Sequence, residues 1–153
     1  MVKDNAAYGT NQLPKFAEDL FKTTRGDWLI PTSEVPLTNI VADMIVDEES
    51  LPRRYTAFTP CFRSEAGAAG KDTAGLYRIH QFDKVELVHF TPEGESWAAL
   101  DQLLDNALEV VRRLGFRYRV IRLATADLTF SSAMTYDIEV WAPGEIGRAS
   151  CRE

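Results

Sequence analysis

The chain has 153 residues, of which 45% are hydrophobic and 26% are charged, and its formal net charge is −6. This composition is typical of a soluble globular protein with one ordinary domain at most. The negative charge excludes a general electrostatic footprint for nucleic acid, so any such contact has to be local. No run approaches the ~18 apolar residues of a membrane span, and the N-terminus has no signal-peptide pattern. We therefore expect a cytoplasmic protein with no membrane partner.

The first predicted elements are two amphipathic helices around a short strand. Apolar residues at helical spacing predict a helix over residues 13–21, with Pro14 in its first turn. The segment WLIP (28–31) predicts a short strand that ends at proline. A second helix is predicted to begin at Thr32, Ser33 and Glu34, which are cap residues followed by an acid. Its apolar side comprises Leu37, Ile40, Val41, Met44 and Ile45.

The clearest helix lies within residues 91–116, where one apolar stripe is ended by Gly115. Two further strands are predicted over residues 118–124 and 134–142. In the second of these, side chains alternate between the set Met134, Tyr136, Ile138, Val140 and the set Thr135, Asp137, Glu139, Trp141. Together the elements predict an α+β fold with an antiparallel β-sheet backed by helices.

A hairpin with a long connection occupies the centre of the chain. Because side chains alternate along strands, one face carries Cys61, Arg63 and Glu65 of the first strand together with Arg78, His80, Phe82, Lys84 and Glu86 of the second. The opposite face carries Phe58 and Phe62 together with Tyr77, Ile79, Val85 and Leu87, and we expect it to be the core face. Cys61 is expected to be a small buried hydrophobic residue. With Cys151 it matches no disulfide spacing, and the two histidines, His80 and His89, offer no zinc-ligand cluster.

The polar face has an ordinary explanation, which is a solvated sheet face with Arg63 in a surface ion pair worth under ~1 kcal/mol. Two features favour a functional site. The connection over residues 66–75 is longer than the ~2–5 residues usual for hairpins, and such loops are often functional. Phe82 is a large ring among charged neighbours, which suits stacking on a nucleobase.

The run TPCFRSEAGAAGKDTAGLYRIHQFDKVELV closely resembles motif 2 of the seryl-tRNA synthetase family, which belongs to the class II aminoacyl-tRNA synthetases. The similarity covers about residues 8 to 144 and includes YGTNQLPKFAEDLF, LIPTSEVPLTN and TYDIEVWAPG. It implies a class II synthetase catalytic core that is incomplete at both ends. The N-terminal coiled-coil arm that grips tRNA, most of motif 1 at the dimer interface, and motif 3 with its Mg²⁺-binding region have no counterpart in the sequence.

The resemblance also implies roles for the matching residues. Arg63 matches the arginine that bridges the ATP α-phosphate and the serine carboxylate, and a guanidinium fork there offsets the repulsion between two anions. Glu86 matches the acid that binds serine, so that Arg63 and Glu86 are the expected catalytic residues. The remaining ATP-binding matches are Ser64, Glu65, which lies near the adenine amino group, and Phe82, which stacks on adenine.

Thr32, Ser33 and Glu34 match the serine-recognition loop of the family. Their spacing also fits an ordinary helix cap, and the two roles can coexist, since a helix N-terminus also attracts a carboxylate. The implied ligands are serine, ATP and Mg²⁺, and the implied partners are serine tRNA and a second copy of the chain in a homodimer. Lys71 and Arg78 suit nucleotide phosphates or the tRNA acceptor end, or are simply solvated.

The sequence departs from the family pattern at several positions. Ala74 stands where the motif 2 loop usually has arginine, and Asn11 replaces a usual glycine. Ala126, Thr129 and Met134 replace two glycines and a lysine, which puts the local backbone shape in doubt. Residues 145–153 can be encoded without a mismatch by a DNA string that, from its second base, resembles a common sequencing adapter. We expect this tail to be non-native, the alternative being a divergent natural terminus.

Three functions stay open from the sequence. The first is the activation of serine as seryl-adenylate and its transfer to serine tRNA, with the isolated chain expected to be inactive. The second is a synthetase-like ligase that charges a carrier protein, and the third is a non-catalytic binding module that kept the fold. Serine-dependent ATP–pyrophosphate exchange excludes the third, and the presence of a tRNA-binding arm separates the first two.

Overall fold

The computed structural model of the chain describes residues 1–66, 78–141 and 148–150. The chain divides into two compact units, Met1–Pro92 and Glu93–Glu153. Each unit is described by itself. Among the described residues, no helix combines the length and the hydropathy needed to cross a bilayer.

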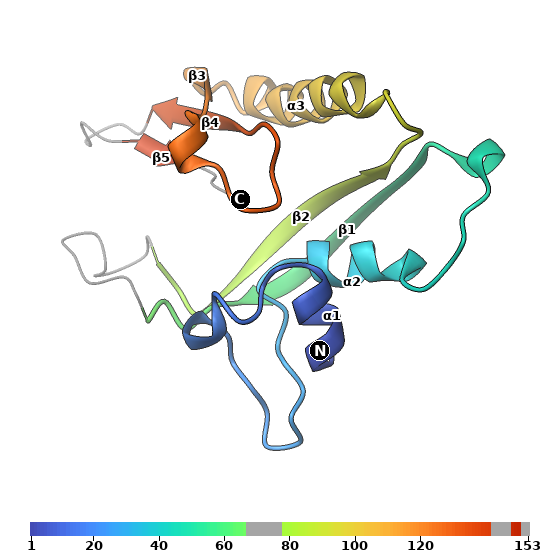
Figure 1. The fold of residues 1–153 in the computed structure, drawn as a ribbon. Helices are drawn as coiled ribbons and strands as arrows, with labels where there is room; N and C mark the ends of the chain where they lie inside the picture. Colours follow the sequence, from blue (N-terminus) through green and yellow to red (C-terminus); the bar gives the residue numbers. More distant parts are fainter. Residues whose placement is uncertain (67–77, 142–147, 151–153) are drawn as a thin grey trace. The chain divides into compact units, whose positions relative to one another are not determined.

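The first unit is built on the predicted hairpin, which the structure confirms. Strands β1 (Arg53–Phe62) and β2 (Gln81–Phe90) pair in antiparallel fashion and run side by side in Figure 1. Their register pairs Cys61 with Phe82, Thr59 with Lys84 and Ala57 with Glu86. Paired residues share a face, so the register confirms the predicted partition for the side chains that lie within the two strands. Of the connection predicted over 66–75, all but the first residue lies outside the described residues.

The prediction of a helix over residues 13–21 is wrong. The first helix lies earlier, as α1 (Asp4–Gly9), and only a 3-10 turn, η1 (Ala17–Asp19), occurs within the predicted range. Leu13 and Leu20 are buried with Ala7 and Trp28 in a small core. Leu13 and Leu20 are therefore buried by a segment of turns that packs on Ala7 of α1, and their helical spacing does not indicate a helix. The predicted strand at 28–31 is reduced to isolated bridges from Trp28 to Val2 and Lys22.

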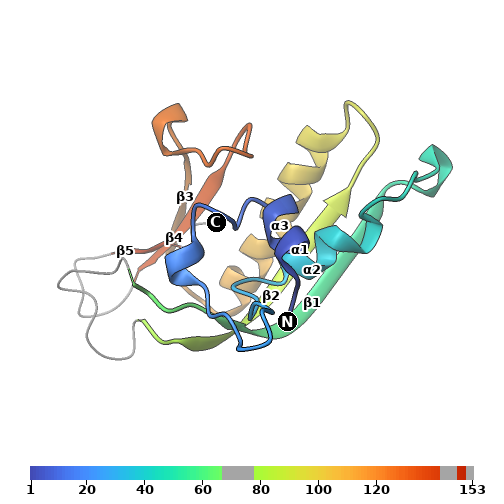
Figure 2. The same cartoon turned by 60° about the horizontal axis from the view of Figure 1, so that its bottom comes forward.

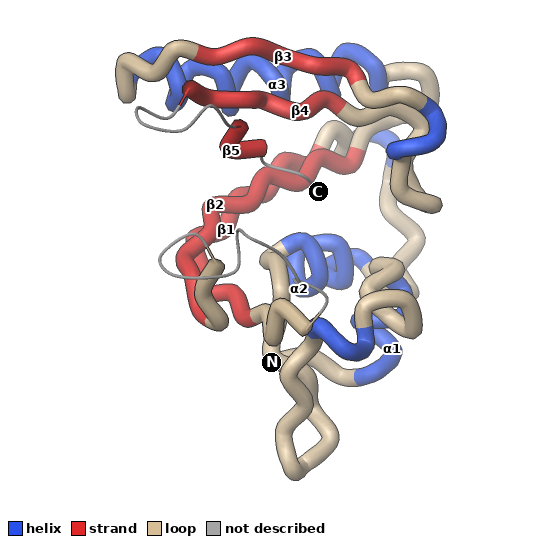
Figure 3. The backbone as a smooth tube through the Cα atoms, turned by 90° about the vertical axis from the view of Figure 1, so that its left-hand side faces the viewer, coloured by secondary structure: helices blue, strands red, loops and turns tan. Residues whose placement is uncertain are grey.

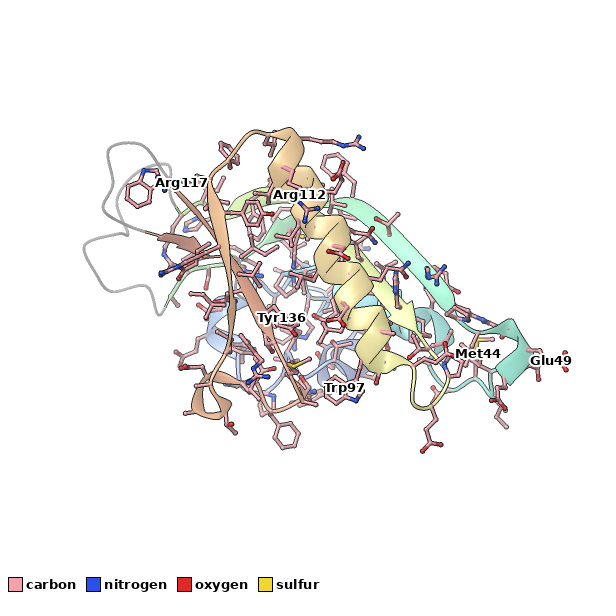
Figure 4. The ribbon with its side chains drawn as sticks, turned by 90° about the horizontal axis from the view of Figure 1, so that it is seen from above. Met44, Glu49, Trp97, Arg112, Arg117 and Tyr136 are labelled. Carbon is pink, nitrogen blue, oxygen red and sulfur yellow. The ribbon has the colours of Figure 1, made fainter. Side chains whose placement is uncertain are left out.

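The second predicted helix begins where expected but is short. Helix α2 (Glu34–Thr38) is followed by one 3-10 turn, η2 (Asn39–Val41), and later by another, η3 (Glu48–Ser50). The Val35 carbonyl accepts both the Asn39 backbone N–H and, at 2.8 Å, the Asn39 side-chain amide, so Asn39 caps the end of the helix. Met44 and Ile45 are consequently 57% and 99% exposed rather than packed on the sheet. Figure 4 labels Met44 and Glu49 on this connection between α2 and β1.

The expectation about which hairpin face is buried is also wrong. Figures 1 and 2 show α1 and α2 beside the hairpin, and α2 contacts both strands. The face that α2 and its preceding segment meet is the polar one, on which Cys61 and Glu86 are buried, whereas Phe58 is 71% and Val85 64% exposed. Burial of the polar face is possible because its groups find partners on the segment before α2. Tyr77, also predicted for the core face, lies outside the described residues.

The second unit confirms the predicted helix and strands. Helix α3 (Ser96–Arg113) ends before Gly115, whose φ of 69° is left-handed. Strands β3 (Tyr118–Arg122), β4 (Tyr136–Trp141) and β5 (Arg148–Ser150) form an antiparallel sheet in that order, with the turn η4 (Thr125–Asp127) between β3 and β4. Figure 3 shows α3 running along this sheet. Figure 4 labels Trp97 and Arg112, which lie toward opposite ends of α3. The fold is α+β with antiparallel strands, as predicted.

The departures from the family pattern leave the described backbone unstrained. Asn11 adopts a φ of 59°, in the left-handed region that asparagine tolerates better than most residues, so it can replace a glycine there. Ala126 and Thr129 are not among the described residues with positive φ. The replacement of glycine at these two positions therefore does not place a residue with a side chain in the left-handed region. Ala74 lies outside the described residues.

Candidate active site

The segment before α2 is fixed on the hairpin by buried hydroxyl groups. Thr32 and Ser33 are 4% and 0% exposed. The Ser33 hydroxyl shares a short hydrogen bond with the Thr59 hydroxyl of β1, and Thr59 Oγ1 lies 3.6 Å from the thiol of Cys61. Cys61 is fully buried, as predicted. These contacts hold the N-terminus of α2 against the polar face of β1.

A second group of contacts joins the same segment to β2. The Thr32 hydroxyl donates to Glu86 Oε2 at 2.5 Å. The Lys84 ammonium lies 3.0 Å from Thr32 Oγ1 and 2.8 Å from Glu86 Oε2. Glu86 is 7% exposed, and a carboxylate at this depth requires such charge-assisted partners. Thr32 and Glu86, which the resemblance assigned to serine, are thus in direct contact.

Glu34 lies at the first turn of α2 with its carboxyl group largely buried. Burial raises its pKa above the ordinary value, and the neighbouring Glu86 raises it further, while Lys84 lowers it. The Glu34 N–H donates to Thr32 Oγ1 at 3.3 Å, and Ser33 makes no side-chain cap bond. The cap and the candidate ligand site therefore coexist, with Thr32 as the capping side chain.

Arg63 and Phe82 form the other part of the polar face. The Arg63 N–H donates to the His80 carbonyl at 3.0 Å, just beyond the paired strands, and its guanidinium lies 5.2 Å from the centre of the Phe82 ring. No carboxylate pairs with Arg63 among the described residues. Its planar fork of five N–H donors is thus held by a ring rather than an acid, and it remains open to an anion.

Ser64 and Glu65 are anchored locally. Ser64 donates its N–H to the Asp19 carbonyl at 2.8 Å and its hydroxyl to the Glu18 carbonyl at 2.6 Å, and Asp19 Oδ1 accepts the Ala66 N–H at 2.9 Å. Glu65 has a φ of 55°, so the strand alternation that placed it with Arg63 ends before it. Its carboxylate pairs with Arg78 at 2.7 Å.

Four residues of this site were missed as functional candidates from the sequence. Lys84, Thr59 and Cys61 have the strand parity of Arg63 and Phe82, so the alternation was the signal that could have found them. Asp19 gave no signal, because its partners follow it by more than 40 positions. Lys71, the loop lysine considered for phosphate or tRNA, lies outside the described residues.

Comparison with known proteins gives related sequences over nearly the whole chain. The serine–tRNA ligase of Paramagnetospirillum magneticum is 62% identical over 145 residues, which are 95% of this chain and 34% of that protein. Those of Sinorhizobium medicae and Brucella canis are 57% and 59% identical over the same lengths. The chain therefore spans about a third of the length of these relatives.

Solved structures agree with the sequence comparison. The seryl-tRNA synthetase of Pyrococcus horikoshii complexed with ATP is 39% identical, with a TM-score of 0.91 over 97% of this chain and 34% of that one. The cytoplasmic serine–tRNA ligase of Naegleria fowleri in complex with AMP is 32% identical, with a TM-score of 0.88 over 97% of this chain and 33% of that one. The sequence pattern of the tRNA synthetase class II core domain (G, H, P, S and T) matches residues 21–152. The chain belongs to this class II tRNA synthetase core family, as a segment of the seryl-tRNA synthetase type.

Proposed function

We propose that this chain supplies the serine-binding and adenine-binding sides of the activation site of a serine–tRNA ligase. The observation that carries the proposal is the shared face of the β1–β2 hairpin. On it, Thr32 and Glu86 form a buried hydroxyl–carboxylate group, and Arg63 lies over the Phe82 ring. The first group suits an ammonium and a hydroxyl, and the second suits a phosphate and a nucleobase.

The proposed reaction joins two anions. The serine carboxylate attacks the α-phosphorus of ATP, the bond to the pyrophosphate leaving group breaks, and seryl-adenylate forms. Arg63 offsets the repulsion between the carboxylate and the phosphate and stabilises the charge of the transition state. Phe82 stacks on adenine, and Ser64 and Glu65 belong to the ATP-binding set, with Glu65 exchanging Arg78 for the adenine amino group.

Serine selection rests on buried acceptors. Thr32 and Lys84 both contact Glu86 Oε2, and Glu86 Oε1 makes no hydrogen bond to a described residue. Oε1 of Glu86 and the carboxylate of Glu34 are thus the acceptors for the ammonium and hydroxyl of serine. A site that hydrogen-bonds a hydroxyl rejects the analogue lacking it by up to ~10⁴–10⁵, so alanine is excluded because it leaves such an acceptor unpaired.

Partners and metal belong to the whole protein. We propose serine tRNA as the acceptor of the activated serine, a homodimer as the assembly and the cytoplasm as the location. Among the described residues, no group of three or more His, Cys, Asp or Glu side chains could hold a metal ion. These residues therefore do not fit a Mg²⁺ site, and no step is assigned to the ion here.

The test uses a chimera in which this chain replaces the matching 145-residue segment of the Paramagnetospirillum magneticum relative. We expect serine-dependent ATP–pyrophosphate exchange, no exchange with alanine, and charging of serine tRNA. Exchange without tRNA charging would favour a carrier-protein ligase. A folded chimera with no exchange would favour a binding module and would contradict the proposal.

A further inference from the structure

Lys84 is a buried charge that the proposed reaction leaves without a role. It lies on β2 two residues from Glu86 and on the same face, with its side chain 19% exposed. Its ammonium contacts Thr32 Oγ1 at 3.0 Å and Glu86 Oε2 at 2.8 Å. An ammonium with this little exposure needs polar partners, and Thr32 and Glu86 supply them.

The hydroxyl of Thr32 is saturated by its contacts. A hydroxyl has one donor and two acceptor sites. Thr32 donates to Glu86 Oε2 and accepts from the Lys84 ammonium and from the Glu34 N–H. Because both lone pairs face donors, the hydroxyl hydrogen can point only toward Glu86. Lys84 is therefore one of the two donors that set the direction of this hydroxyl.

We propose that Lys84 is a positioning residue of the serine site, which holds the Thr32 hydroxyl on Glu86 and engages Glu86 Oε2 so that Oε1 is presented to serine. This inference rests on the proposed function. Removal of Lys84 frees one lone pair of Thr32 and lets the Glu86 carboxylate turn. The Glu86 carboxylate oxygens then no longer meet serine in a fixed geometry.

Lys84 also sets the charge of the cluster. Lys84 places a positive charge beside the carboxyl groups of Glu34 and Glu86. On the β1 side, the neutral Thr59 hydroxyl bonds to Ser33, next to Glu34, and lies beside the Cys61 thiol. Lys84 lowers the pKa of Glu34, whereas burial and Glu86 raise it. Without Lys84, Glu34 retains its proton to higher pH, and that proton competes with the serine ammonium.

The experiment compares Lys84→Met with Lys15→Met in the chimera. Lys15 is exposed and lies over the Phe16 ring, so its replacement makes the same chemical change away from the cluster. For Lys84→Met we expect the KM for serine to rise about 10–100-fold, the scale for partners that orient a binding group, with the KM for ATP little changed. The acidic limb of kcat/KM for serine should move to higher pH. Lys84→Arg, which keeps the charge, should leave that limb in place.

A double-mutant cycle with Thr32→Val isolates the contact. If Lys84 acts through Thr32, the two substitutions are non-additive both in serine KM and in urea unfolding. Additive effects with an unmoved pH limb would overturn the inference, as would a loss of unfolding stability with no change in serine KM. An unmutated chimera without serine exchange would instead refute the proposed function. In that event the unfolding cycle alone decides whether Lys84 positions Thr32.

Discussion

Replacement of Arg63 by alanine in the chimera should separate catalysis from folding. In the folded chain the Arg63 side chain makes one described contact, at 5.2 Å from the Phe82 ring centre, and a partly exposed cation–π contact is worth about 0.5–1 kcal/mol. The backbone N–H that bonds to His80 is kept in alanine. Loss of one positioned donor at a developing charge costs ~10²–10³ in rate, or about 2.7–4 kcal/mol. The catalytic loss should thus exceed the stability loss several-fold.

The assay pairs serine-dependent ATP–pyrophosphate exchange with thermal unfolding of the same preparations. Arg53→Ala is the matched control, because Arg53 begins the same strand and its guanidinium bonds only to the nearby Ser50 hydroxyl among described residues. We expect Arg53→Ala to leave exchange unchanged. Arg63→Lys, which keeps the charge but not the planar fork, should fall between alanine and the unmutated chimera.

Three results would refute this reasoning. Exchange by Arg63→Ala within tenfold of the unmutated chimera would mean that the guanidinium does not bridge the two anions. Equal loss of exchange in Arg63→Ala and Arg53→Ala would mean that the strand as a whole, rather than its end, carries the effect. If the fall in unfolding temperature of Arg63→Ala accounted for its loss of exchange, the effect would be one on folding rather than on catalysis.

Three further outcomes are expected. The 153-residue chain alone should give less than a tenth of the exchange of its full-length relative, because it spans 34% of that protein; comparable exchange would contradict this. In urea unfolding of the chimera, Ser33→Ala and Thr59→Val should each cost about 0.5–1.5 kcal/mol and the pair less than their sum, since they share one hydrogen bond; additivity would contradict it. Glu34→Gln should stabilise the fold at pH 7. Because the folded pKa of Glu34 is raised, the native state binds the extra proton, and its stability falls as pH rises through that pKa. The gain in unfolding stability from Glu34→Gln should therefore vanish at lower pH. The same variant should lose serine-dependent exchange.

The hairpin was predictable because one rule governs it. Side chains alternate along a strand whatever surrounds it, so the sequence correctly grouped Phe82, Lys84 and Glu86 with Cys61 on one face. The rule stops where the strand stops. Glu65 was assigned by the same alternation, but its φ of 55° lies beyond the end of β1.

Helix extents were not predictable from apolar spacing alone. Leu13 and Leu20 recur at helical spacing but are buried from turns against Trp28. The apolar residues after α2 continue the helical pattern, yet the α-helix ends at Thr38 and only a 3-10 turn follows it. In α3 the prediction was right, because a long stripe and Gly115 gave the same end point. Length and an independent stop signal made the difference.

The inverted burial of the hairpin fits the proposed binding role of its polar face. A carboxylate recognises an ammonium more strongly in a dry site than in water, so the burial of Glu86 would favour the selectivity proposed for it. It can be buried only if Thr32 and Lys84 satisfy it, and both reach it on the polar face. That face is therefore the one against which α2 and its preceding segment fold, and Phe58 on the opposite face is left exposed. A pattern that equates apolar residues with the core fails at such a face because polar groups that satisfy one another can be buried in place of apolar ones.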